Sequence, residues 1–117
     1  MALNQRYPHA KHIELTAPAG GVIGGNPYKI GQFVGVALHT KNAGERFTLW
    51  LDGSYDVNVT GALTEGQLVC IKASDNTLTA TATGNFPYGV ALAAKGAGAG
   101  VVEVAPFGKI ITTTALA

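Results

Sequence analysis

Ser54 and Ser74 are the only serines of the chain, and hence the only candidates for a Ser-His-Asp nucleophile. Such a serine needs a histidine base within hydrogen-bond reach and a carboxylate that orients the histidine. Ser54 would have to recruit His39 and Asp52, and nothing in their spacing brings the three together. Neither serine stands in the Gly-x-Ser-x-Gly sequence of a nucleophile elbow. The sequence therefore gives no support to a serine hydrolase.

Potential metal and phosphate ligands are equally sparse. His9 and His12 would approach one another only on a helix, and Pro8 together with the alternating pattern that follows disfavours a helix there. The glycine-rich residues 96–100 resemble a phosphate-binding loop, but a valine-rich strand follows them, not the helix that such a loop needs. Cys70 stands in an apolar run, which predicts a small buried side chain rather than a reactive thiol. We therefore expect no metal, no cofactor and no enzymatic activity.

Trp50 and Tyr55 are the large aromatic residues on either side of Gly53. The acidic residues are scattered outside any aromatic-rich run, so a two-carboxylate glycosidase mechanism has no support. The two aromatic rings fit a sugar-stacking site, a contact with a partner, or ordinary core packing. Core packing is the simplest of the three interpretations.

The composition predicts a weakly charged surface. The net charge is +1, only 13% of the residues are charged, and there are 16 glycines. Lys and Arg are spread along the chain, so no basic face is predicted that would displace the counterions of a nucleic acid. No stretch approaches the roughly 20 apolar residues of a membrane helix, and the N-terminus has no apolar signal core. We expect a protein made in the cytoplasm that binds neither nucleic acid nor membrane.

The hydrophobic pattern predicts an all-β protein. Short runs rich in Val, Ile, Thr and aromatic residues alternate with Gly, Pro, Asn and Asp, and no segment carries a helical period. Ser74-Asp75-Asn76 is predicted to be a hairpin turn. Asp52-Gly53 fits either a tight turn or a bulge inside one longer strand, and the bulge is slightly favoured. The predicted strands cover residues 12–16, 33–38, 47–51, 67–73, 77–83, 88–93, 101–104 and 109–113.

An internal repeat is the most informative feature of the sequence. Gly35-Val36-Ala37-Leu38 recurs as Gly89-Val90-Ala91-Leu92, and Gly25–Ile30 loosely parallels Gly66–Ile71. Lys41, Ala43 and Gly44 recur in the same way as Lys95, Ala97 and Gly98. We expect two related β modules, at approximately residues 25–60 and 66–110, that face one another in a single compact barrel or sandwich. This single domain would span residues 12–117, after an extended N-terminal arm of residues 1–11.

The order of several short motifs resembles a known family. Glu14-Leu15-Thr16-Ala17-Pro18-Ala19-Gly20-Gly21-Val22, a Gly-x-Pro turn and then residues 35–38 look like the opening half of the phage capsid cement, or head decoration, proteins. Thr79-Ala80-Thr81-Ala82-Thr83-Gly84-Asn85, which leads into residues 89–92, is similar to the closing half. The resemblance covers nearly the whole chain, from about Lys11 to Val104.

The resemblance implies a non-enzymatic virion protein. Such proteins bind the outside of a tailed-phage head after the shell has expanded, with the major capsid protein as their partner. Related proteins commonly form trimers, so a homotrimer is expected at least on the capsid, after synthesis in the host bacterial cytoplasm. Their N-terminal arms often extend a capsid sheet by strand addition.

Seven residues are expected to contact the capsid or another copy of the chain: Leu3, Arg6, Tyr7, Pro8 and His9 in the arm, and Trp50 and Tyr55. The main alternative is a carbohydrate- or receptor-binding β module of a virion or cell surface. That function would make Trp50 and Tyr55 an exposed platform. A small β-barrel enzyme with sites shared between subunits is a third hypothesis, and only the scattered histidines and carboxylates would serve it.

Overall fold

The computed structural model describes residues 12–112 and 114–116, and every regular element in that part of the chain is a β-strand. The all-β fold class expected from the hydrophobic pattern is confirmed. The strands are β1 (His12–Thr16), β2 (Pro27–Ile30), β3 (Phe33–Ala37), β4 (Arg46–Trp50), β5 (Tyr55–Thr60), β6 (Leu68–Ile71), β7 (Leu78–Thr79), β8 (Phe86–Ala91) and β9 (Ala99–Pro106).

The first four strands form an open antiparallel sheet in the order β1-β4-β3-β2. At its β2 edge, Pro27 is the first residue of the strand and has no N–H to offer a further strand. The backbone N–H of Lys29 on the same strand donates to Asn76 Oδ1 of the barrel at 3.0 Å. A proline and an occupied donor make this edge unsuited to further strand pairing.

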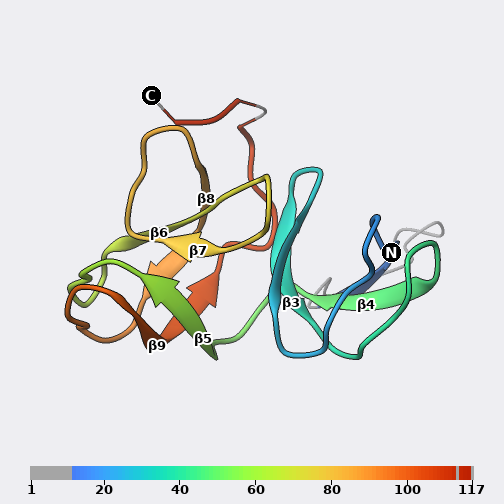
Figure 1. The fold of residues 1–117 in the computed structure, drawn as a ribbon, viewed down its shortest axis with the longest axis horizontal. Helices are drawn as coiled ribbons and strands as arrows, with labels where there is room; N and C mark the ends of the chain where they lie inside the picture. The colour runs from blue at the N-terminus through green and yellow to red at the C-terminus, as the bar shows by residue number, and fades with distance from the viewer. Residues whose placement is uncertain (1–11, 113, 117) are drawn as a thin grey trace, which may run out of the picture.

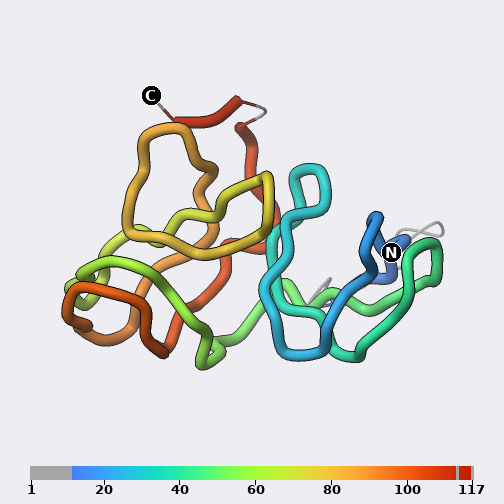
Figure 2. Tube along the Cα trace, in the orientation of Figure 1, coloured from blue at the N-terminus to red at the C-terminus, as the bar shows by residue number. Residues whose placement is uncertain are grey.

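The remaining strands form a closed barrel in the order β5-β7-β6-β8-β9. β5 pairs with β9, β9 with β8, and β8 with β6, all antiparallel. The short strand β7 completes the ring because it pairs in parallel with β5 and antiparallel with β6. In Figure 1 the barrel fills the left half and the open sheet the right half, and Figure 2 shows the green segment that carries the chain from sheet to barrel.

The open sheet and the barrel are built on one plan. The order β1-β4-β3-β2 corresponds strand for strand to β5-β9-β8-β6. The Gly25 N–H donates to the Ala37 carbonyl at 2.8 Å, and the Gly66 N–H donates to the Ala91 carbonyl at 2.8 Å. The hydrogen bonds thus follow the repeat seen in the sequence. The same isolated bridge also recurs, as Val22–Lys41 and Leu63–Lys95.

The two copies differ in the connection between their second and third strands. In the open sheet this connection is residues 31–32, whereas in the barrel it is residues 72–85 and contains β7. The sequence predicts one barrel or sandwich shared by both modules. The structure instead closes the second module on itself, because the longer connection supplies the strand that covers the free edges of β5 and β6.

Asp52-Gly53 is a turn between the two sheets, so the predicted bulge inside one longer strand is wrong. β4 ends at Trp50 and β5 begins at Tyr55 in the barrel. Gly53 has a φ of 90°, which side-chain-bearing residues rarely adopt.

Other strand predictions need correction as well. Of the predicted strand 109–113, the described residues contribute only the isolated bridge Phe33–Lys109, and the predicted strand 77–83 is reduced to β7. The sequence does not predict β2, because a proline begins it, and it predicts the residues after Gly53 as the continuation of one longer strand rather than as the separate strand β5. The turn predicted at Ser74-Asp75-Asn76 does lie between β6 and β7.

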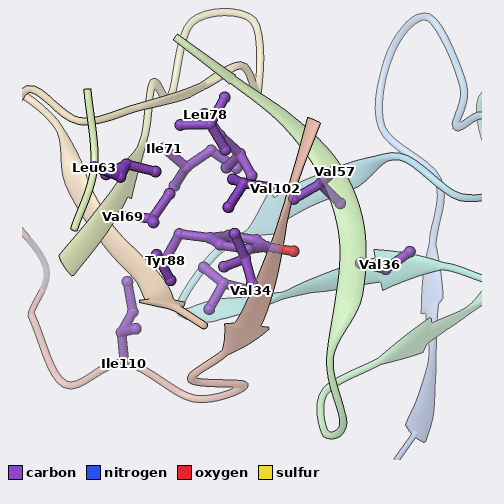
Figure 3. Packing of buried hydrophobic residues seen from close by; sticks show 13 residues of the cluster. Val34, Val36, Val57, Leu63, Val69, Ile71, Leu78, Tyr88, Val102 and Ile110 are labelled. Carbon is purple, nitrogen blue, oxygen red and sulfur yellow. The ribbon is translucent and has the colours of Figure 1, made fainter. Parts of the chain in front are cut away.

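Side chains from β3 complete the core of the barrel. Val34 and Val36 belong to the cluster of buried residues that fills the barrel, while a separate cluster fills the open sheet. Figure 3 shows the ring of Tyr88 lying between Val34 and Val102. The Tyr88 hydroxyl donates to the Gly35 carbonyl at 3.2 Å, and burial raises the pKa of this phenol above its ordinary value. β3 therefore joins sheet to barrel by packing and by hydrogen bonds, since the buried Val34 N–H also donates to the Gly108 carbonyl at 2.7 Å.

Gly35 and Gly89 occupy equivalent places in the two copies. A Cβ on Gly35 would overlap the carbonyl oxygen of Trp50, and a Cβ on Gly89 would overlap the carbonyl oxygen of Ala105. The absent side chains allow β4 to lie close against β3, its neighbour in the open sheet, and β9 to lie close against β8 in the barrel. The repeated Gly-Val-Ala-Leu is thus a packing motif.

Candidate docking surface at the junction of sheet and barrel

An apolar hollow lies where the open sheet meets the start of the barrel. Its volume is about 440 Å³, and its lining residues are Gly25, Val36, Ala37, Leu38, Trp50 and Tyr55. Leu38 is 45% exposed, whereas Trp50 and Tyr55 are half-buried. Because covering apolar surface is favourable in water, the hollow suits the insertion of an apolar side chain.

Trp50 stands in a row of residues that crosses the open sheet. The strand register places His12 opposite Trp50, Trp50 opposite Val36, and Val36 opposite Pro27. The His12 and Trp50 ring centroids are 4.7 Å apart, with their planes tilted by 42°. The first described residue of β1 therefore contacts a residue that lines the hollow.

Tyr55 lines the hollow from the barrel side. Its hydroxyl donates to the Asp52 carbonyl at 2.6 Å across the Gly53 turn. Burial, and then the negative charge of Asp52, raise the pKa of the Tyr55 phenol above its ordinary value. Tyr55 consequently stays a neutral donor at physiological pH, with the Asp52 carboxylate close to the rim of the hollow.

A polar groove adjoins the hollow and shares Gly25 with it. The groove has a volume of about 370 Å³. Asp75 lines it and accepts hydrogen bonds from the Thr77 hydroxyl at 2.7 Å and the Thr77 N–H at 3.1 Å. These bonds hold the pKa of the Asp75 carboxyl below its ordinary value. The groove therefore presents negative charge beside an apolar hollow. Its lining residues are Gly25, Asn26, Pro27, Tyr28, Asp56, Val57, Asn58, Thr60, Asp75, Asn76, Thr77 and Leu78.

A second apolar groove follows the C-terminal segment. It has a volume of about 340 Å³. Phe107 on its wall is 46% exposed and Ile111 is 98% exposed. Single exposed apolar residues are ordinary, but several around one groove form a patch that a partner can cover. The lining residues are Pro87, Phe107, Lys109, Ile110, Ile111, Thr112 and Leu116.

Two of the seven predicted contact residues, Trp50 and Tyr55, lie together in the hollow. Both are half-buried, so they form neither an exposed stacking platform nor part of a sealed interior. The sequence reasoning missed Leu38, because it placed this residue inside the predicted strand 33–38, whereas β3 ends at Ala37 and Leu38 is exposed. The other five predicted residues lie outside the described part of the chain: Leu3, Arg6, Tyr7, Pro8 and His9.

The catalytic arrangements considered from the sequence are not assembled among the described residues. The Ser54 hydroxyl donates to the Glu103 carboxylate at 2.5 Å, and the Asp52 carboxylate accepts from the Gly53 N–H at 2.9 Å. Neither bond involves His39. Within residues 12–112 and 114–116, no group of three or more His, Cys, Asp or Glu side chains is placed to hold a metal ion, and no helix has the length and apolar character to cross a membrane.

The side-chain ammonium group of Lys95 is bound by backbone carbonyls of the glycine-rich loop. Lys95 Nζ donates to the carbonyl oxygens of Gly61 at 2.9 Å, Gly96 at 2.8 Å and Gly98 at 2.5 Å. Phosphate binding needs converging N–H groups, and here carbonyl oxygens converge instead. The resemblance to a phosphate loop is therefore superficial.

Cys70 has the environment of a structural cysteine. It is buried, with 1% of its surface exposed, and has no disulfide partner. Burial raises the pKa of the Cys70 thiol, which disfavours the reactive thiolate. The expectation of a small buried apolar side chain is confirmed.

Comparison with known proteins identifies the family. The sequence matches the family model described as phage cement protein over residues 7–106, a span that includes both sheets. No curated protein matches the sequence. Among solved structures, the chain is similar to the head fiber gp8.5 N base of bacteriophage phi29, with 14% identity and a TM-score of 0.46. That match covers 86% of this chain and 99% of the fiber chain.

The fold is all-β, and the described residues leave two apolar surfaces open to solvent. The family match covers most of the sequence, and the chain belongs to the phage cement protein family. It is thus a structural protein of a phage virion, as the resemblance of the sequence motifs predicts. Membership of this family of structural proteins also favours a role without enzymatic activity.

Proposed function

We propose that the chain binds the outer surface of a tailed-phage capsid and stabilises the expanded head, with the major capsid protein as its partner. The observation that carries this proposal is the cement family match over residues 7–106, because it includes both sheets. The low content of charge and the apolar hollow and groove support a role in protein contacts.

The proposed capsid contacts are the seven residues predicted from the sequence. Trp50 and Tyr55 supply apolar surface in the hollow, and the remainder belong to the N-terminal arm. A shell presents the same binding site many times, so linked copies hold it tightly even when each contact is weak. The protein would be made in the host cytoplasm and would reside on the exterior of the virion.

We further propose that copies of the chain associate as a homotrimer, at least on the capsid. The C-terminal groove supports self-association, because Phe107 and Ile111 expose apolar surface around it. Covering such surface contributes roughly 25 cal/mol per Å². Light scattering coupled to size-exclusion chromatography measures the mass in solution, and an Ile111→Lys variant should lower that mass if the groove is the interface.

Co-sedimentation with heads from the genome that encodes the chain tests the capsid role. The purified protein is mixed with unexpanded and with expanded heads at rising concentration, and the pelleted protein is quantified. Saturable pelleting with expanded heads, accompanied by higher resistance of those heads to heat, is the expected result. The Leu38→Glu variant should bind more weakly. Leu92→Glu is the matched control, since Leu92 is the repeat equivalent of Leu38 and lines no hollow described above.

A protein that pellets with neither kind of head would overturn the capsid proposal. A glycan screen would then test the carbohydrate- or receptor-binding alternative. Equal weakening by Leu38→Glu and Leu92→Glu would instead show that the hollow is not the contact surface, without affecting the capsid role itself.

A further inference from the structure

The apolar hollow lies beside His12, the first residue of β1. His12 begins β1, and its ring contacts Trp50, which lines the hollow. Residues 1–11 therefore precede His12 next to an apolar surface that the described residues leave open.

The arm is long enough to reach across the hollow. Trp50 on β4 and Val36 on β3 are the next two residues in the row that starts at His12. Strands lie about 4.8 Å apart, so this path is about 10 Å. An extended residue spans at most about 3.6 Å, so Pro8 and Tyr7, four and five residues before His12, reach β3.

The arm also contains side chains whose polarity and charge match the apolar hollow and the acidic groove beside it. It contains the apolar residues Leu3, Tyr7 and Pro8, together with Arg6 and Lys11, and it has no acidic residue. The aromatic ring and the proline suit an apolar hollow of about 440 Å³.

Three carboxylates belong to the barrel side of the hollow or to the groove that adjoins it. The charge of Asp52 acts on Tyr55 at the rim, and Asp56 lines the polar groove that shares Gly25 with the hollow. Asp75 lies in the same groove. A basic segment laid across the hollow would place its cationic side chains near these groups, where charge complementarity favours it.

We infer that residues 6–11 of the free protein dock in cis in this hollow, with Tyr7 and Pro8 against Trp50 and Leu38, and with Arg6 over the groove at Asp56. Docking in cis is favoured over a second copy because a short tether gives the arm an effective concentration in the millimolar range. The hollow and the arm would then become available to a partner together, when the arm leaves. This inference goes beyond the proposed function and holds whether or not the chain binds heads.

Trp50 reports on the arm directly, because it is the only tryptophan of the chain. Acrylamide quenching of its fluorescence is measured in the full-length protein and in the Tyr7→Ala variant. We expect the quenching constant to rise about twofold in Tyr7→Ala, since one face of the indole loses its cover. Gln5→Ala is the matched control in the same arm, and it should quench as the unmodified protein does.

The electrostatic part of the inference has its own test. Arg6→Glu should raise quenching, and adding Asp56→Arg to the same chain should lower it again, because the two charges are then exchanged. Both measurements are repeated at 1 µM and 100 µM protein, and the cis arrangement requires the same quenching at each concentration. These experiments contain no phage heads, so their result is separate from that of the capsid-binding test.

Three results would each overturn the inference. The first is identical quenching in the unmodified protein and in Tyr7→Ala. The second is protection of Trp50 that disappears on dilution, which would assign the hollow to a second copy. The third is failure of Asp56→Arg to restore protection in the Arg6→Glu chain.

Discussion

Alanine at Gly35 should destabilise the protein strongly. The added Cβ would overlap the Trp50 carbonyl oxygen and lie 3.3 Å from Leu49 Cγ. A backbone atom cannot rotate away as a side chain can, so β3 and β4 must separate locally. Overpacking of this kind costs about 1–3 kcal/mol, and one lost ladder hydrogen bond costs about 1 kcal/mol more. We expect Gly35→Ala to lower the free energy of unfolding by about 2–4 kcal/mol.

The expected change in Tm follows from this change in the free energy of unfolding. Unfolding entropy is about 2.1 cal/mol/K per residue, so for 117 residues each kcal/mol shifts Tm by about 4 °C. Gly35→Ala should therefore lower Tm by about 8–16 °C in a calorimetric or circular-dichroism melt. Gly89→Ala should behave alike, because its Cβ would overlap the Ala105 carbonyl oxygen at the equivalent contact between β8 and β9.

Gly96→Ala is the matched control. A Cβ at Gly96 would meet nothing within 4 Å, and its φ is not in the left-handed region. Alanine there removes freedom from the unfolded chain, so stability should stay unchanged or rise by up to about 1 kcal/mol. If Gly35→Ala melts within a few degrees of Gly96→Ala, the close contact of β3 with β4 is not a real constraint and the reasoning fails.

Three further predictions follow from single contacts. Tyr88→Phe should lower the free energy of unfolding, measured by urea denaturation, by about 1–2 kcal/mol, because it removes the hydroxyl that donates to the buried Gly35 carbonyl. Tyr28→Phe is the control and should lower it by less, since it removes an exposed hydrogen bond. The raised pKa of Tyr88 means that its contribution is fully present below about pH 10, the ordinary pKa of tyrosine, and is lost as pH rises above that value. Alkaline destabilisation should therefore be smaller in Tyr88→Phe, and an equal pH dependence would refute this assignment. Lys95→Met should speed amide hydrogen exchange in residues 96–100 by removing the bonds to three carbonyls. Lys41→Met, the repeat equivalent, should leave that loop unchanged, and equal effects of the two substitutions would contradict the role given to Lys95.

The all-β class and the internal repeat could be predicted because they rest on local pattern. Alternation of apolar and polar residues marks β1 and β4, and Gly35-Val36-Ala37-Leu38 recurs openly in the sequence. The glycines of that motif meet the same kind of obstacle in both copies, a carbonyl oxygen of the neighbouring strand. Because the same packing constraint acts in both copies, the same short sequence occurs in both.

The arrangement of the two modules could not be predicted in the same way. Closure of the barrel depends on β7, whose two residues are too short to carry a period of their own. The hollow could not be predicted either, because Leu38 follows β3 and Trp50 ends β4, and only the fold shows that these two strands pair. Trp50 and Tyr55 were singled out by size, and the turn at Gly53 brings them into one hollow from different sheets.

The placement of β3 has a consequence for how the molecule unfolds. Val34 and Val36 belong to β3, a strand of the open sheet, yet their side chains are packed in the core of the barrel. Gly108 and Lys109, after the last barrel strand, in turn pair back with the start of β3. Unfolding of the sheet alone would expose the barrel core to water. Unfolding of the barrel alone would expose the apolar side chains of β3. We therefore expect one cooperative transition, with equal calorimetric and van't Hoff enthalpies, rather than two separate steps.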